Sequence, residues 1–403
     1  MPEKSSSHKP EVALNAAAGS VAFRSDWSIG DREHRALPLW DWILLPLIGV
    51  VTIAILGGCS RLIADRDTAQ SKQVVGTCIQ QDGTGPRHGV PNSVCIERNS
   101  SGQLVEYKFN SCGDRSPFDC AQKPEGVFRI VLIGSSIPMG WDVLESDSLS
   151  ERLLANLSWA THRRVEVYNS AMEGSGGSPD TLANRMPHTV ALRPDLILWV
   201  ISSWDIDPDK LRAQDKAPQG GMRGSRILGR VFGRFKVANI LTEYLFRSQS
   251  VYLAAYLRNI REGARAQGTP SGDDDGRMRL FSSDVTAIAD QARAAGVPLV
   301  ATFLPNRAEA DLLSMSSIPA SIDPGRRSNA VRSILVENGA TYVDALPDLE
   351  RTPNLDGLYD QLGYHLNAEG HAALTEILAK ALTGTIPVLA TGEQAQSERM
   401  QKK

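Results

Sequence analysis

The sequence predicts an α/β fold in which helices cover both faces of a parallel sheet, giving three layers, with one transmembrane helix before it. From residue 126 onward, short apolar runs alternate with segments of helical periodicity, which is the pattern of strand and helix units in a parallel sheet. Earlier in the chain, residues 42–58 carry no charged side chain. The 403 residues, 42% of them hydrophobic, provide for one large core with appendages.

The apolar segment at residues 39–58 is predicted to be a transmembrane signal anchor. Its uncharged stretch is long enough to cross a bilayer, and Trp40 and Trp42 stand at one end, where indole rings favour the interface. A buried core helix is the alternative, but the segment contains Gly and Pro and has no polar face. We expect residues 1–38 to be a disordered cytoplasmic tail, which places the C-terminal domain on the export side of a bacterial inner membrane.

A second interpretation of this segment is a cleaved lipoprotein signal. Leu56-Gly57-Gly58-Cys59 resembles the lipobox of bacterial lipoproteins, which would make Cys59 a lipidated N-terminus. The polar region before the apolar run is far longer than the charged start of an ordinary signal peptide. The uncleaved single-pass anchor is therefore favoured.

Four further cysteines, Cys78, Cys95, Cys112 and Cys120, lie in a segment at residues 59–125 that we interpret as a linker subdomain. An even set predicts two disulfides, and four cysteines allow three pairings, of which Cys78 with Cys95 and Cys112 with Cys120 is the local one. A zinc site would need closer Cys-x-x-Cys spacing. Disulfides agree with export, since they persist in oxidising compartments.

The main domain is predicted at residues 126–386. Its strands are expected at residues 127–134, 165–171, 195–202, 298–305 and 340–346. Its helices are expected at residues 149–156, 181–191, 284–296 and 368–382, the last capped by Asn367. Residues 206–280 are interpreted as a helical insertion, whose basic amphipathic stretch could contact an anionic lipid or polymer or be a solvated helix face. Residues 387–403 are expected to be a disordered tail.

Four blocks in this domain resemble those of the SGNH, or GDSL-like, hydrolases, a flavodoxin-like α/β/α fold. They are Gly134-Ser135-Ser136 with Gly140, Tyr168-Asn169-Ser170-Ala171, Ser202-Ser203-Trp204-Asp205, and His365 through His371. Their order is that of the family, and Ser135 takes the place of its Asp. The lead-in segments YKFNSCGDR and KPEGVFRI resemble membrane-associated members related to alginate acetylation. The resemblance covers about residues 107–382.

This resemblance implies a serine nucleophile at Ser136 and a general base at His365. It also implies an oxyanion hole lined by the backbone N–H groups of Ser136 and Ala171, with Asn169 and Asp205 in the same cleft. Ser135 would bond within its turn.

Two positions depart from the family pattern. Trp204 stands where an Asn normally completes the oxyanion hole, and it either donates from its indole or leaves the hole one donor short. The acid that orients the histidine normally lies two or three residues before it, but here Asp360 is the nearest carboxylate, with Asp356 further back. A Ser–His dyad oriented by a backbone carbonyl is the remaining arrangement.

The sequence therefore predicts a membrane-anchored serine esterase or O-acyltransferase that acts on acyl groups, with acetyl the expected one, of an envelope polysaccharide or glycoconjugate. A catalytically inactive glycan-binding or assembly protein is the alternative, with Trp204 as a stacking platform. Expected partners are the acylated glycan, the inner membrane and, as a candidate, a membrane-bound acyltransferase. We expect no metal or organic cofactor. The net charge of −3 indicates no nucleic-acid partner.

Overall fold

The structure is a computed structural model of the chain. The chain forms two units, Met1–Leu56 and Gly57–Lys403. It describes residues 47–48, 51–52, 78–81, 86–99, 103–174, 177–206, 245, 248, 250–254, 257, 272–314, 323, 325–353, 355–360 and 365–390. The predicted tail at residues 1–38 and all but four residues of the predicted span at 39–58 lie outside these ranges. Within them, no helix is long and apolar enough to cross a membrane.

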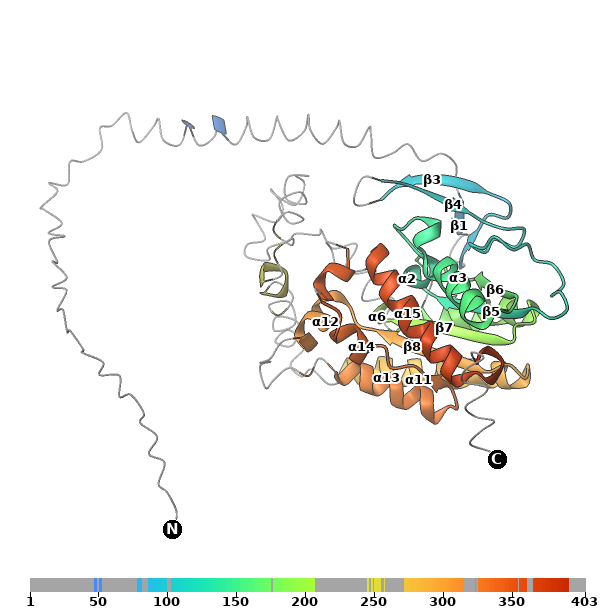
Figure 1. Cartoon of the computed structure of the whole chain (residues 1–403). Coiled ribbons are helices and arrows are strands. Elements are labelled where there is room, and N and C mark those ends of the chain that lie inside the picture. Colours follow the sequence, from blue (N-terminus) through green and yellow to red (C-terminus); the bar gives the residue numbers. More distant parts are fainter. Residues whose placement is uncertain are drawn as a thin grey trace, which may run out of the picture. The chain divides into compact units, whose positions relative to one another are not determined.

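A five-stranded parallel sheet lies at the centre of the second unit (Figure 1). Its strand order is β6-β5-β7-β8-β9. The strands are β5 (Phe128–Gly134), β6 (Val165–Asn169), β7 (Leu196–Ser202), β8 (Leu299–Leu304) and β9 (Thr341–Tyr342). Every residue of the first four strands is buried, which explains why β5, β7 and β8 read as nearly continuous apolar runs. Strand β6 differs, because it also buries Glu166 and Asn169. The predicted sheet is confirmed, although its last strand is shorter than expected.

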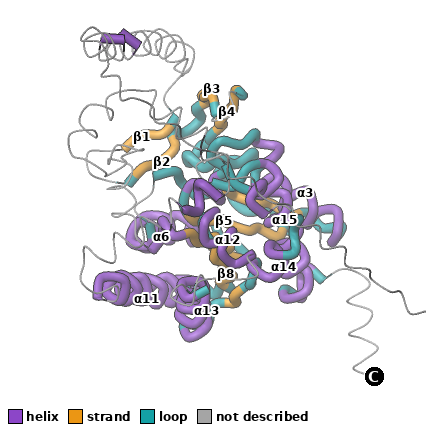
Figure 2. The backbone as a smooth tube through the Cα atoms, turned by 90° about the vertical axis from the view of Figure 1, so that its left-hand side faces the viewer, coloured by secondary structure: helices purple, strands orange, loops and turns teal. Residues whose placement is uncertain are grey.

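Helices cover both faces of this sheet (Figure 2). They are α3 (Leu149–Thr161), α5 (Met186–Ala191), α11 (Gly272–Ala294), α12 (Arg307–Ser314), α13 (Arg326–Glu337), α14 (Leu346–Glu350) and α15 (Ala368–Thr385). Leu132 of β5 belongs to a core cluster with the leucines of α3 and α15, whereas its neighbour Ile133 belongs to a cluster with residues of α5, α11 and α13. Because successive strand residues point to opposite faces, this division shows the three predicted layers.

Shorter helical segments connect the main elements. They are α2 (Ser136–Met139), η1 (Glu145–Asp147), α4 (Ser178–Asp180), the π-helical turn η2 (Thr181–Arg185), α6 (Ser203–Ile206), η3 (Leu355–Leu358) and η4 (Pro387–Leu389).

Helix α11 begins at Gly272, well before the helix start expected at residue 284. The first turns of α11 include the acidic run at residues 273–275. Carboxylates in a first helical turn interact favourably with the helix dipole, so this run suits a helix start. Most of the predicted insertion at residues 206–280 lies outside the described residues, and its predicted end falls inside α11.

Asn367 caps α15 as predicted, because its side-chain oxygen accepts the backbone N–H groups of Glu369 and Gly370, both at 3.0 Å. The described residues continue to residue 390, beyond the predicted boundary at residue 386. Leu389 in η4 is fully buried in the core cluster of α3 and α15, so this residue belongs to the fold rather than to a tail. Residues 391–403 lie outside the described residues.

The N-terminal extension forms two small antiparallel sheets. Strands β1 (Ile79–Gln81) and β2 (Arg87–Gly89) make one, and β3 (Val94–Arg98) and β4 (Leu104–Lys108) make the other. Disulfides join Cys78 to Cys95 and Cys112 to Cys120, which is the local pairing among the three considered. The core of this extension includes Met139, Ala171 and Met172 from the main domain. It therefore packs against the end of the sheet where β5 and β6 finish.

Candidate active site

Ser136 lies immediately beyond the carboxyl end of β5, as the first residue of the short helix α2. The chain passes to β6 on one side of β5 and then to β7 on the other, so this end of β5 is the point where open α/β sheets form their clefts. Gly134 makes the tight turn with φ +139°, and a Cβ there would approach the Val200 carbonyl oxygen to 2.4 Å. The turn presents the Ser136 side chain at this end of the sheet.

His365 lies beside Ser136, although 229 residues separate them in the sequence. The His365 Nε2 atom is 2.9 Å from Ser136 Oγ, and its Nδ1 atom is 3.3 Å from Asp360 Oδ2. A bridge between Tyr359 and Leu366 and the hydrogen bond from Asp360 N to His365 O, at 2.9 Å, bring the acid back to the imidazole. The structure thus brings all three sequence-predicted catalytic residues together.

The protonation of the His365 ring follows from these two contacts. With the proton on Nδ1, the ring donates to the Asp360 carboxylate and leaves Nε2 to accept the Ser136 hydroxyl proton. This arrangement can activate a hydroxyl nucleophile and stabilise the imidazolium that forms. The His365 and Asp360 side chains are only 22% and 13% exposed, so the ion pair formed on proton transfer is partly shielded from water.

Asp205 lies beneath the nucleophile turn and does not face a cleft. It is fully buried, and its Oδ2 atom accepts the N–H and hydroxyl of Ser202, at 2.8 and 2.9 Å, and the hydroxyl of Ser135, at 3.3 Å. Burial raises the pKa of the Asp205 carboxyl to about 6. The hydroxyl of Ser135, expected to bond within its own turn, bonds instead to Asp205 of α6 and lies 3.2 Å from the hydroxyl of Ser202 at the end of β7.

Asn169 is also fully buried rather than exposed to a substrate. Its amide nitrogen donates to the carbonyl oxygens of Pro138 and Met139, at 2.9 and 3.3 Å, which ties the end of β6 to α2. Its Oδ1 atom accepts the backbone N–H of Ala171 at 3.2 Å. The Ala171 N–H that was predicted to line the oxyanion hole therefore makes a hydrogen bond inside the chain in this structure.

The other predicted cleft residues are Trp204 and the backbone of Ser136. Trp204 is the second residue of α6, is partly exposed, and donates its backbone N–H to Ser202 Oγ at 3.3 Å. The N–H of Ser136 lies at the start of α2, where first-turn N–H groups have no partner within the helix.

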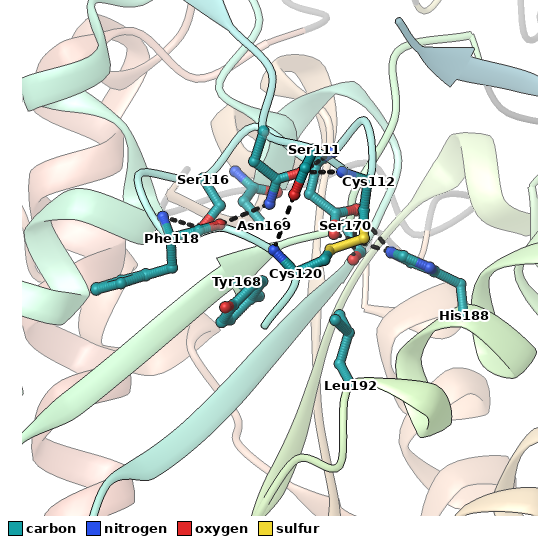
Figure 3. Close-up of polar contacts among 12 residues, drawn as sticks. Ser111, Cys112, Ser116, Phe118, Cys120, Tyr168, Asn169, Ser170, His188 and Leu192 are labelled. Carbon is teal, nitrogen blue, oxygen red and sulfur yellow. Dashed lines mark hydrogen bonds and ion pairs between the residues drawn. A yellow bond between two sulfur atoms is a disulfide. The ribbon is translucent and has the colours of Figure 1, made fainter. Parts of the chain in front are cut away.

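Sequence reasoning missed the residues between Cys112 and Cys120. Asp114 is buried, accepts the Ser170 hydroxyl at 2.8 Å, and has an oxygen 2.9 Å from His188 Nε2. Figure 3 shows the disulfide beside Ser170 and His188, over the ends of the strands. The only signal in the sequence was the position of Asp114-Arg115 inside a short loop closed by two cysteines.

The chain is similar to solved structures of ester-cleaving enzymes. They include a psychrotrophic esterase from Pseudoalteromonas sp. inhibited by monoethylphosphonate, with 12% identity, 64% of this chain and 97% of that chain covered, and a TM-score of 0.36. A lipase/acylhydrolase from Enterococcus faecalis has 12% identity, covers 64% and 96% of the two chains, and has a TM-score of 0.38. A catalytic mutant of an acetylxylan esterase from Geobacillus stearothermophilus has 11% identity, 63% and 93% coverage, and a TM-score of 0.37. No protein-family model and no curated protein matches the sequence.

Proposed function

We propose that this chain is an SGNH-type serine esterase or O-acyltransferase with Ser136 as nucleophile, His365 as general base and Asp360 as the acid that orients the base. One observation carries the proposal. Ser136 Oγ lies 2.9 Å from His365 Nε2, and the opposite ring nitrogen lies 3.3 Å from the Asp360 carboxylate. That geometry is the requirement for activating a serine hydroxyl at neutral pH.

The reaction proceeds through an acyl-enzyme. His365 Nε2 takes the Ser136 proton as Oγ attacks the ester carbonyl carbon, and the same nitrogen then protonates the leaving alcohol oxygen. The acyl group is then bound to Ser136 as an ester. His365 next takes a proton from water, for hydrolysis, or from a sugar hydroxyl, for transfer. Collapse of the second tetrahedral intermediate releases the product and returns the proton to Ser136.

The oxyanion hole is the weakest part of this site. Ser136 N–H is one donor, whereas Ala171 N–H bonds to Asn169 and Trp204 occupies the position of the usual Asn. A missing donor lowers transition-state stabilisation by about 3 kcal/mol. This observation favours, as a second candidate, a glycan-binding or assembly protein that retains the cleft without turnover.

The proposed substrates are acetyl esters on an envelope polysaccharide or glycoconjugate, and the proposed location is the export side of a bacterial inner membrane. The charge-free segment at residues 42–58 supports an anchor. The two disulfides support an oxidising compartment. Such an enzyme would work beside the membrane, where a membrane-bound acyltransferase is a proposed partner.

The proposal is tested by p-nitrophenyl acetate hydrolysis and by fluorophosphonate labelling of the full chain. We expect wild type to turn over and to label at Ser136, and S136A to do neither. D360N should lower kcat by about 10²- to 10⁴-fold, because the amide favours the wrong tautomer of His365. H365A should lose both signals while remaining folded.

The matched control is H162N, because His162 is an exposed histidine at the end of α3 whose positive φ of 53° suits Asn. It should retain wild-type turnover. If folded wild type neither hydrolyses the ester nor labels, the esterase proposal fails, and glycan-binding measurements would then test the second candidate.

A further inference from the structure

Arg115 contacts the turn that carries the proposed nucleophile, although it comes from the N-terminal extension. Its side chain is buried, and its guanidinium donates to three carbonyl oxygens that follow Ser136 in the chain. The distances are 3.0 Å to Met139, 2.5 Å to Gly140 and 3.1 Å to Val143. These hydrogen bonds fix the end of α2 and the loop after it.

Helix α2 needs such support because it has only four residues. A helix this short makes too few internal hydrogen bonds to be stable alone. Its last carbonyls would lack partners at the end of the helix, and Arg115 and Asn169 supply them from two different segments. The position of Ser136, at the other end of this single turn, therefore depends on donors from outside the helix.

Arg115 is itself held firmly. The Cys112–Cys120 disulfide closes its loop, and its backbone N–H donates to Asn169 O at 3.1 Å. The guanidinium carbon lies 4.5 Å from the ring centroid of Tyr107, which stacks in turn on Trp141. Next to it, Asp114 bonds to Ser170 and His188. Asp114 and Arg115, two neighbouring residues of one loop, thus form hydrogen bonds with the ends of β6 and α2.

We infer that Arg115 is a positioning residue, which holds Ser136 at hydrogen-bonding distance from His365 without touching the substrate. The inference rests on the proposed function. Since displacement of a reacting group by about 1 Å can cost about 100-fold in rate, loss of these bonds should lower kcat and leave KM nearly unchanged.

Arg129 provides a matched control within the same strand region. It is also buried, its guanidinium carbon lies 4.7 Å from the ring centroid of Tyr168, and it donates to the carbonyl oxygen of Leu192 at 2.8 Å. Unlike Arg115, it also pairs with the Glu166 carboxylate at 2.9 Å. Arg129 is, however, the second residue of β5, so it lies at the amino end of that strand, whereas Ser136 follows the carboxyl end. Loss of Arg129 should therefore affect folding stability without moving the nucleophile.

The experiment compares R115M, R115K and R129M in the full chain, with rates corrected for the folded fraction. R115M should lower kcat for p-nitrophenyl acetate and the labelling rate of Ser136 by about 100-fold, with KM within about 2-fold of wild type. R115K should lose about 10-fold, because one ammonium cannot reproduce the fork of donors. R129M should keep kcat within about 2-fold of wild type. Equal kcat in R115M and R129M would overturn the inference.

Hydrogen exchange of the peptides covering residues 135–143 supplies a readout that needs no activity. Exchange there should be faster in R115M than in wild type and unchanged in R129M. If wild type has no esterase activity, the proposed function fails, while exchange still decides whether Arg115 orders this turn. Unchanged exchange in a folded R115M would refute the positioning role, whether or not the enzyme is active.

Discussion

At the scale of single residues, Asp205 shows how a buried carboxylate can support the turn that carries the proposed nucleophile. It lies below β5 and β7, and its hydrogen bonds from Ser135 and Ser202 join the ends of the two strands. Full burial of the carboxyl disfavours its charged form, which raises its pKa to about 6. The contribution of Asp205 to folding stability should therefore depend on pH between its unfolded and folded pKa values, where the folded protein keeps the carboxyl proton and the unfolded chain has lost it.

We predict that D205N gains stability over wild type as pH rises. The folded pKa of Asp205, about 6, exceeds the unfolded value of about 3.9, so its contribution is fully present below about pH 4 and is lost as pH rises through about 6. Asn carries no charge and escapes this loss. The unfolding free energy of D205N minus that of wild type should therefore rise by on the order of 2 kcal/mol between pH 4 and pH 7. Denaturant titrations at several pH values measure it, and a difference independent of pH would contradict the prediction.

At the scale of elements, the loop between Cys112 and Cys120 does more than order a linker. Its residues make side-chain hydrogen bonds to the ends of β6 and α2, and the OH of Tyr168 donates to the carbonyl of Asp119 at 2.5 Å. The Cys78–Cys95 disulfide lies elsewhere in the extension, where it joins the segment before β1 to β3. The two cross-links should therefore differ in their effects on the site.

We predict that the Cys78–Cys95 disulfide contributes more to folding stability, whereas the Cys112–Cys120 disulfide contributes more to the reactivity of Ser136. The sequence separations are 8 residues for Cys112–Cys120 and 17 for Cys78–Cys95, so loop-closure entropy assigns them about 2.5 and about 3 kcal/mol of stabilisation. The pair C112S/C120S should nevertheless slow fluorophosphonate labelling of Ser136 more than C78S/C95S does. Denaturant unfolding and labelling rates of both double variants provide the test, and equal slowing would remove the special role of the shorter loop.

At the scale of the whole molecule, the N-terminal extension and the sheet domain share a core. Cys95, Tyr107 and Phe109 of the extension cluster with Met139 and Met172 of the sheet domain. The boundary predicted at residues 125 and 126 therefore divides segments that bury apolar surface against each other. Truncation at that boundary would expose this surface and remove Arg115.

We predict that a chain beginning at residue 126 is less stable than one beginning at residue 77, and that it labels at Ser136 at least about 100-fold more slowly. The longer fragment keeps both disulfides and should label at the rate of the full chain. Unfolding and labelling of the two purified fragments measure the difference. Full-rate labelling by the shorter fragment would show that the extension is dispensable for the site.

The sequence by itself determined the order of strands and helices and the cap of the last helix. Through the resemblance of its four blocks, it also indicated Ser136, His365 and Asp360 as candidate site residues. Apolar runs and capping residues act through local geometry, so they can be recognised without knowing the fold. The start of α11 and the burial of Leu389 were missed because acidic and terminal segments carry weak periodicity.

Only the tertiary structure decided how the site is built. It places Asp360 against His365 through a bridge between neighbouring segments, and it buries Asp205 and Asn169 as supports of the nucleophile turn rather than as walls of a cleft. It also brings Arg115 to the end of α2. These contacts join residues that are distant in the sequence, and their geometry depends on strand order and packing, which no local pattern encodes.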